Sequence, residues 1–256
     1  MSLRQRVLPA GFIVPCLPTS APQPPRGALW LHEIKHDGFR VIARKNGSRV
    51  RLYSRPGNDL TQRFPLIVEA LARLRSLSCI IDGEAVACGD DGVALFDRIR
   101  YRRHDASVFM WAFDIIELNG DDLRCEPLEW RKATLAKLLA RAGYGVQFNE
   151  HLEAEGPVVF DHACRMGLEG IVSKRKASCY QSGRSRDWLK SKNPQAPAVT
   201  RLAESGLGAI MVFKGKQETF APVTLGHIRS HGCRDLLVYC ISGRCYHSGG
   251  GKEVTS

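Results

Sequence analysis

Tight turns between short alternating segments constrain the fold of this chain most strongly. Residues 39–43 and 49–53 alternate apolar and polar side chains, as half-buried strands do, and Asn46 and Gly47 lie between them. Asn-Gly is a strong hairpin signal because both residues tolerate positive φ. Residues 28–35 predict another strand, which ends at the turn dipeptide formed by Asp37 and Gly38. Neighbouring strands are therefore expected to pair antiparallel.

Helical and extended segments are interspersed along the rest of the chain. Helices are predicted at residues 61–74 with Thr61 as the N-cap, at 127–141 and at 157–166. Strands are predicted at residues 79–87, 108–116, 169–174 and 188–192. Recurrent hairpins favour an α+β fold, with antiparallel sheets flanked by helices, over a doubly wound parallel sheet.

The composition fits a folded protein with a polyanionic partner. Hydrophobic residues make up 44% of the 256 residues, and the formal net charge is +11. Such a charge suggests nucleic acid or an acidic surface, although a generally basic proteome explains it equally well. No run approaches the roughly 18 apolar residues of a membrane helix, and residues 1–10 lack the apolar core of a signal peptide. Nine cysteines at irregular spacing favour reduced thiols, so a cytoplasmic protein without membrane contact is expected.

Lys35 is the first candidate for chemistry. It ends an apolar strand immediately before a tight turn. A partly desolvated lysine amine held in a fixed orientation can act as a nucleophile. By itself this position proves little, because most lysines at strand ends are solvated surface residues.

Lys35 belongs to the first of six elements that occur in a fixed order, and together they are far more specific. The elements are Lys35-x-Asp37-Gly38-x-Arg40, Ser54-Arg55-x-Gly57-x-Asp59, Asp82-Gly83-Glu84, Phe113-Asp114, Glu169-Gly170-Ile171-Val172-Ser173-Lys174 and Trp188-Leu189-Lys190-Ser191-Lys192. This series resembles the ordered motifs of the covalent nucleotidyltransferases, which are DNA ligases, RNA ligases and mRNA capping enzymes. Over residues 8–201 it looks most like bacterial ATP-dependent DNA ligases of the end-joining ligase D type.

The resemblance implies an ATP-grasp-like nucleotidyltransferase core and a role for each motif. Lys35 would become covalently linked to AMP. Lys190 and Lys192 alternate on one strand face and would contact the α-phosphate. The remaining implied ATP contacts are Glu33 at the adenine amino group, Phe113 stacked on adenine, Arg40 and Arg55 at the ribose and phosphates or at a DNA 5′-phosphate, and Ile34 and Lys174 nearby. A core position is the alternative for Phe113, and an ordinary basic strand is the alternative for the lysine pair.

Two glutamates are the expected metal ligands. Glu84 and Glu169 each lie beside a glycine in a strand, and Mg²⁺ or Mn²⁺ prefers carboxylate oxygens. By resemblance Glu169 would face the metal, and Glu84 would bind either the ribose hydroxyl or the metal. A second basic group, formed by Arg98, Arg100, Arg102 and Arg103, suits either a DNA backbone or a solvated loop.

The sequence divides into an extended lead-in at residues 1–26, an adenylation domain at 27–201 and a Gly/Cys-rich tail at 202–256. DNA ligases of this type continue into an OB-fold domain, and the residues after Lys192 are too few for one, so an OB-fold domain is expected to be absent. The tail carries Cys233, Cys240, Cys245 and His247, whose spacing gives a weak zinc signal. Free or buried thiols are the preferred interpretation there.

The expected function is that of an ATP-dependent DNA ligase core that forms a lysyl-AMP intermediate and passes AMP to a DNA 5′-phosphate in repair. The expected partners are nicked or broken double-stranded DNA and end-joining proteins, and the chain is expected to be a monomer. One alternative is an RNA ligase or capping-type nucleotidyltransferase. Another is a DNA-binding accessory protein with impaired catalysis.

Overall fold

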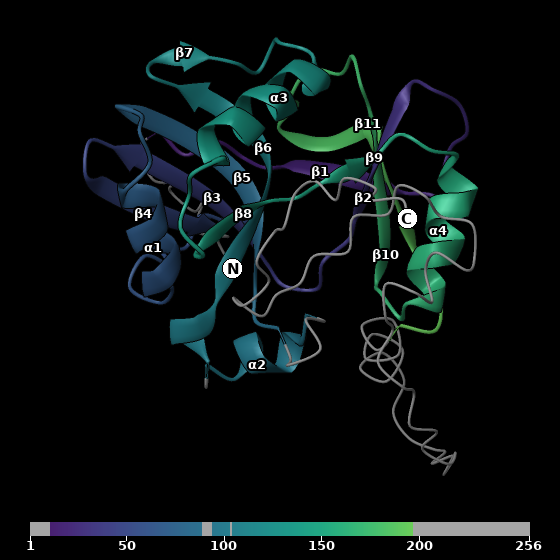
Figure 1. Ribbon diagram of the computed structural model, residues 1–256, viewed down its shortest axis with the longest axis horizontal. Helices are drawn as coiled ribbons and strands as arrows, with labels where there is room; N and C mark the ends of the chain where they lie inside the picture. Colours follow the sequence, from purple (N-terminus) through teal and green to yellow (C-terminus); the bar gives the residue numbers. More distant parts are fainter. Residues whose placement is uncertain (1–10, 89–93, 103, 197–256) are drawn as a thin grey trace, which may run out of the picture. The chain divides into compact units, whose positions relative to one another are not determined.

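The computed structural model describes residues 11–88, 94–102 and 104–196, and the strands of this part form two sheets (Figure 1). The five-stranded sheet has the order β1-β11-β10-β2-β9. Its strands are β1 (Cys16–Ser20), β2 (Trp30–Ile34), β9 (His151–Leu152), β10 (Gly170–Arg175) and β11 (Gly183–Lys192). β1 pairs with β11 in parallel, and the other pairs in this sheet are antiparallel.

The six-stranded sheet follows the order β4-β3-β5-β6-β7, and β8 pairs with β6 in parallel. The predicted hairpin is confirmed, because β3 pairs antiparallel with β4, but its turn residues are Gly47 and Ser48, and Asn46 is paired with Arg49 at the end of β3. The strands are β3 (Phe39–Asn46), β4 (Arg49–Ser54), β5 (Ser78–Val86), β6 (Phe109–Leu118), β7 (Asp121–Asp122) and β8 (Val146–Phe148). The α+β prediction holds, but the two parallel pairs make the sheets mixed.

Short helices cover the sheets (Figure 1). They are α1 (Pro65–Ala72), α2 (Phe96–Arg100), the 3-10 turn η1 (Asp105–Ser107), α3 (Leu128–Leu139) and α4 (Gly156–Arg165). α1 and α3 contact strands of the six-stranded sheet, whereas α4 packs on β10 and β2. Within the described residues, no helix combines the length and apolarity needed to cross a membrane.

Two hydrophobic clusters hold the six-stranded sheet against its helices and the two sheets against each other. The larger one joins the six-stranded sheet to α1 and α3, around residues such as Phe64 and Leu135. A second cluster contains Leu31 of β2, Ile42 of β3 and Trp188 of β11, so it lies between the two sheets. Burial of these side chains fixes the facing sides of the sheets against each other.

The prediction that Thr61 caps the first helix is wrong. The helix begins at Pro65, with Phe64 at the N-cap and no side-chain cap. Thr61 instead accepts a hydrogen bond from the backbone of Leu52 at 3.1 Å. Proline is favoured in a first helical turn because it lacks an N–H, and this preference locates the helix start better than the Thr61 signal does.

The described residues include the predicted boundary near residue 26 but not the one near residue 200. Within the predicted lead-in, Cys16–Ser20 forms a strand of the five-stranded sheet rather than a separate segment, and residues 1–10 lie outside the described residues. The predicted boundary near residue 200 and the tail at 202–256, with its cysteines and histidines, lie outside the described residues.

Candidate active site

The predicted residues of three motifs share one face of the five-stranded sheet. Glu33 of β2 pairs with Val172 of β10, and Val172 pairs with Lys190 of β11. Directly opposed residues in antiparallel strands project to the same side, and so do residues two positions apart. Lys35, Lys174 and Lys192 therefore project from the same face as Glu33.

The facing side of the six-stranded sheet supplies the other motif residues. Arg40 of β3 pairs with Glu84 of β5, and both side chains are at least partly buried. Burial raises the pKa of Glu84 to about 7, Arg40 and Lys35 act in the opposite direction, and Glu169 raises it further. Glu84 lines the same cavity as Lys35, and Lys35 pairs with Glu169, so both carboxylates predicted to bind metal lie around Lys35.

Lys35 lies between the two sheets beside Glu169. Its Nζ is 2.5 Å from Oε2 of Glu169, and the Nζ of Lys192 is 3.8 Å from Oε1 of the same carboxylate. The Lys35 side chain is 22% exposed and the Glu169 side chain 7%. The carboxylate therefore holds both amines at one place, and the amine of Lys35 stays accessible.

A cavity of about 100 Å³ opens beside Lys35. Its volume is well below the roughly 300–1,000 Å³ of typical small-molecule pockets, so it is sized for part of a nucleotide. Seven of the predicted residues line it, together with residues outside the predicted set. The complete lining is Pro18, Glu33, Ile34, Lys35, His36, Arg40, Glu84, Phe113, Asn149, Val172, Lys174 and Trp188.

The four predicted residues that do not line this cavity lie around Lys35 or Lys190. Glu169 and Lys192 contact each other as described above. Burial lowers the pKa of Lys190, and the charges of Lys192, Lys35, Arg184 and Arg55 lower it further. The base-sized cavity is thus bordered by a group of cations, which suits a nucleotide whose phosphates extend out of the cavity.

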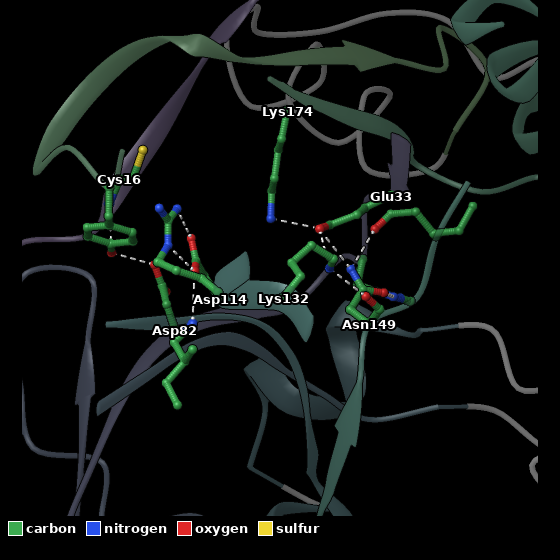
Figure 2. Close-up of polar contacts among 12 residues, drawn as sticks. Cys16, Glu33, Asp82, Asp114, Lys132, Asn149 and Lys174 are labelled. Atoms are coloured by element: carbon green, nitrogen blue, oxygen red, sulfur yellow. Dashed lines mark hydrogen bonds and ion pairs between the residues drawn. The ribbon is translucent and has the colours of Figure 1, made fainter. Parts of the chain in front are cut away.

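Glu33 is the centre of a buried network (Figure 2). Its Oε1 is 2.7 Å from the Nζ of Lys132, and its Oε2 is 2.7 Å from the Nζ of Lys174 and 3.3 Å from the amide nitrogen of Asn149. Burial would raise the pKa of Glu33, but Lys132 and Lys174 outweigh burial and the pKa is lowered. Glu33 is therefore a carboxylate even though it is only 2% exposed.

Lys132 and Asn149 were missed by the sequence analysis. Lys132 is four residues after Leu128 and three before Leu135, which is the spacing of one helix face. Both leucines are completely buried, and Lys132 is 1% exposed. The sequence signal that could have identified Lys132 is its position, as a charged residue, on the apolar stripe of α3. Asn149 follows β8 in a segment with no local pattern, so only the fold reveals it.

Arg40 has protein partners that the sequence did not indicate. Its Nε and Nη2 donate to Asp82 at 2.5 and 2.7 Å, and Nη2 also donates to the carbonyl oxygen of Cys16 at 2.9 Å. Tyr180 donates to the same Asp82 at 2.6 Å. In this structure Arg40 therefore joins β3 to β5 and β1. Its contact with ribose or phosphate stays a prediction.

Phe113 lies in the hydrophobic core and also borders the cavity. It is 7% exposed and belongs to the cluster between the sheets, yet it also lines the cavity. The guanidinium of Arg40 lies 4.4 Å from its ring centroid and the Nζ of Lys174 lies 4.2 Å away. Burial lowers the pKa of Lys174 to about 8 despite the opposing charge of Glu33. Stacking of adenine on Phe113 stays a prediction.

A larger hollow of about 740 Å³ lies elsewhere and contains no predicted ATP-binding residue. Of its lining arginines, Arg51 pairs with Asp59 and Arg63 with Asp105, so much of its charge is neutralised. In the predicted basic group nearby, Arg98 donates to the carbonyl of Cys88. Arg103 lies outside the described residues. The smaller cavity beside Lys35 is the stronger candidate for chemistry, because reactive and charged side chains converge on it.

Comparisons with known proteins agree with this geometry. Residues 24–192 match the model of the ATP dependent DNA ligase domain. The chain is 36% identical over 185 residues to the multifunctional non-homologous end joining protein LigD of Pseudomonas aeruginosa. The matched segment covers 71% of this chain and 22% of that protein. The chain is 34% identical over 193 residues to LigD of Mycolicibacterium smegmatis, covering 72% of this chain and 25% of that protein. The chain thus spans about a quarter of the length of these relatives.

Solved structures give the same family. The ligase domain of Mycobacterium tuberculosis LigD matches with a TM-score of 0.63 and 32% identity, over 70% of this chain and 60% of that one. A mycobacterial DNA ligase D complexed with ATP matches with a TM-score of 0.63 and 31% identity over the same shares. The nucleotidyltransferase fold inferred from the motifs is therefore confirmed. The chain belongs to the family of ATP-dependent DNA ligase domains.

Proposed function

We propose that this chain uses ATP to adenylate Lys35 and transfers the AMP to a DNA 5′-phosphate during strand joining. The observation that carries the proposal is the position of Lys35. Its amine lies at the edge of the cavity, 2.5 Å from Glu169. Lys190 and Lys192 supply positive charge next to it, and Arg55 adds positive charge near Lys190. A base in the cavity would leave its phosphates among these cations.

The first step forms one bond and breaks one. The neutral amine of Lys35 attacks the α-phosphorus of ATP, and the bond from that phosphorus to the bridging oxygen breaks. Pyrophosphate leaves with the electron pair, and the nitrogen loses a proton, giving a lysyl-AMP phosphoramidate. In this proposal Glu169 holds the amine before the reaction, and Lys190 and Lys192 stabilise the negative charge on the phosphate oxygens.

The next two steps act on DNA. A 5′-phosphate oxygen attacks the phosphorus of the adenylate, which releases Lys35 and leaves AMP on the DNA end. A 3′-hydroxyl then attacks the 5′-phosphorus, and AMP leaves as the strands join. The net charge of +11 favours contact with the phosphate backbone.

The site residues fit a hard divalent cation. Glu84 and Glu169 both lie around Lys35, and Mg²⁺ is usually bound by one or two carboxylates together with substrate phosphates. No cluster of three or more His, Cys, Asp or Glu side chains suited to a metal occurs in the described part of the chain. Substrate oxygens would therefore complete the coordination of Mg²⁺ or Mn²⁺, and the ion would supply charge neutralisation on the phosphates.

The proposed partners follow from the family. The curated relatives are named as non-homologous end joining proteins, which supports nicked or broken double-stranded DNA as the substrate and end-joining proteins as partners. We propose a monomer that acts in the bacterial cytoplasm at the nucleoid, where this substrate occurs.

The central test is adenylation of the full chain with α-labelled ATP and Mg²⁺ or Mn²⁺. Wild type is expected to retain acid-labile label, and Lys35→Ala is expected to retain none. Lys137→Ala is the matched control, because Lys137 is an exposed lysine of α3. Unchanged labelling of Lys35→Ala would contradict the proposal.

The same assay separates the alternatives. Labelling by GTP instead of ATP would indicate a capping-type enzyme, and no labelling of wild type with either metal ion would favour an accessory DNA-binding role. Comparison of nicked duplex DNA with nicked RNA as acceptors separates a DNA ligase from an RNA ligase.

A further inference from the structure

Lys132 is a buried cation that belongs to none of the motifs. It lies on α3 and is 1% exposed, so its ammonium has no access to bulk water. Its Nζ donates to Oε1 of Glu33 at 2.7 Å and to the carbonyl oxygen of Asn149 at 3.0 Å, and it lies 4.5 Å from the ring centroid of Phe148. Burying an ammonium is costly unless it is paired, and the pairing here is to a residue of the cavity wall.

The hydrogen bonds of Glu33 leave a defined part of its carboxylate available. A carboxylate offers about four acceptor positions on its two oxygens. Lys174 and Asn149 both lie on Oε2, and Lys132 lies on Oε1 (Figure 2). One acceptor position of Oε1 therefore remains beyond these contacts, and Glu33 lines the cavity. A ligand group that meets Glu33 there must bring a hydrogen-bond donor.

We propose that Lys132 is a positioning residue that makes the cavity selective for a 6-amino purine by holding Glu33 as an oriented hydrogen-bond acceptor. This inference rests on the proposed function, because it assumes that the purine of the nucleotide enters the cavity beside Lys35. Adenine presents a donor at position 6, whereas guanine and hypoxanthine present a carbonyl acceptor there. An ionised Glu33 pairs with the first group and repels the second.

The charges around Glu33 explain why Lys132 matters although Lys174 remains. Lys132 and Lys174 together offset the effect of burial and lower the pKa of Glu33. The other titratable groups that face Glu33 are His36 and His151. Burial lowers the pKa of His36 to about 4 and also lowers that of His151, so neither supplies a positive charge near neutral pH. Without Lys132, Glu33 would take up a proton more readily, and its O–H would donate a hydrogen bond to the carbonyl oxygen of a 6-oxo purine.

The experiment compares α-labelled ATP with α-labelled ITP, because inosine differs from adenosine in carrying a 6-oxo group instead of the 6-amino group. The initial rates of lysyl-nucleotide formation are measured with the full chain, at several pH values. The variants are Lys132→Met, which removes the charge at similar length, and Lys132→Arg, which keeps it. Lys137→Met on the exposed side of the same helix is the control.

Lys132→Met is expected to lower the ATP-to-ITP rate ratio about tenfold or more, the size expected for loss of one charge-assisted hydrogen bond. The ratio should recover as the pH rises and Glu33 ionises again. Lys132→Arg and Lys137→Met should keep a ratio close to that of wild type. A merely structural role would slow both nucleotides equally and leave the ratio unchanged, which would overturn the inference.

The outcomes also separate this inference from the proposed function. If wild type takes no label, the proposed function fails first. If wild type prefers ATP and Lys132→Met keeps that preference, only the inference fails. Should Lys132→Met not fold, Lys132→Gln takes its place, because it keeps a donor to Glu33 without the charge. Its ratio is expected to fall, and a ratio equal to that of wild type refutes the role of the charge.

Discussion

Removal of Arg131 tests how the Phe113-Asp114 motif is held in place. The Nε and Nη2 of Arg131 donate to the two oxygens of Asp114 at 2.8 and 2.9 Å, and Nη1 donates to the carbonyl oxygens of Glu126 and, at 2.9 Å, of Ser178. Arg131 and Asp114 are both 0% exposed. This one side chain of α3 therefore joins β6 to the turn between β10 and β11.

The expected cost of Arg131→Met follows from this burial. Met keeps most of the aliphatic length but leaves Asp114 buried without its counter-charge. Breaking a buried ion pair in this way costs about 3–5 kcal/mol, a large part of the roughly 5–15 kcal/mol by which domains are stable. The expected fall in the melting temperature is roughly 6–20 °C for a protein of this size.

The assay is equilibrium unfolding in urea, followed by tryptophan fluorescence. It compares wild type, Arg131→Met, Asp114→Leu and the double variant, with Arg141→Met as an exposed-arginine control. The double variant should recover most of the loss, because two apolar side chains replace two buried charges. A loss below about 1 kcal/mol in Arg131→Met, or strictly additive effects of the two substitutions, would refute the assignment of this pair as the anchor of the motif.

Two further predictions concern stability. Burial lowers the pKa of His36 from 6.5 to about 4, so the unfolded chain binds a proton that the folded chain does not. Folding stability should therefore be complete above pH 6.5 and decline as the pH falls towards 4, by at most about 3 kcal/mol. His36→Gln should lose this slope and His104→Gln should keep it in urea unfolding, and identical slopes in both variants would contradict the assignment. Gly170→Ala should destabilise by about 2 kcal/mol or more, because Gly170 has a φ of +133° and a Cβ there would lie 2.1 Å from the carbonyl oxygen of Ser191. Gly167→Ala, with a φ of +70° and no atom within 4 Å, should cost less, and equal losses in thermal melts would show that the contact with Ser191 is unimportant.

The local elements were largely predictable because they depend on short-range signals. The hairpin turn that follows Asn46 requires a residue that tolerates positive φ, and the structure gives Gly47 a φ of +58°. Apolar periodicity located α3 and α4 within two residues at each end. The parallel pairing of β1 with β11 was not predictable, because its partners are more than 160 residues apart and no local pattern encodes it.

The sequence by itself predicted the candidate reactive positions, since ordered motifs specify residue types whose chemistry is independent of their exact surroundings. Lys35, Glu84, Glu169 and the strand lysines were all identified in this way. Only the tertiary structure decided which groups support them, because burial and pairing depend on contacts between distant segments. It assigned Lys132 and Asn149 to Glu33. It also gave Arg40 a partner in Asp82, and showed that a lysine on an apolar helix stripe pairs with Glu33 of the cavity wall.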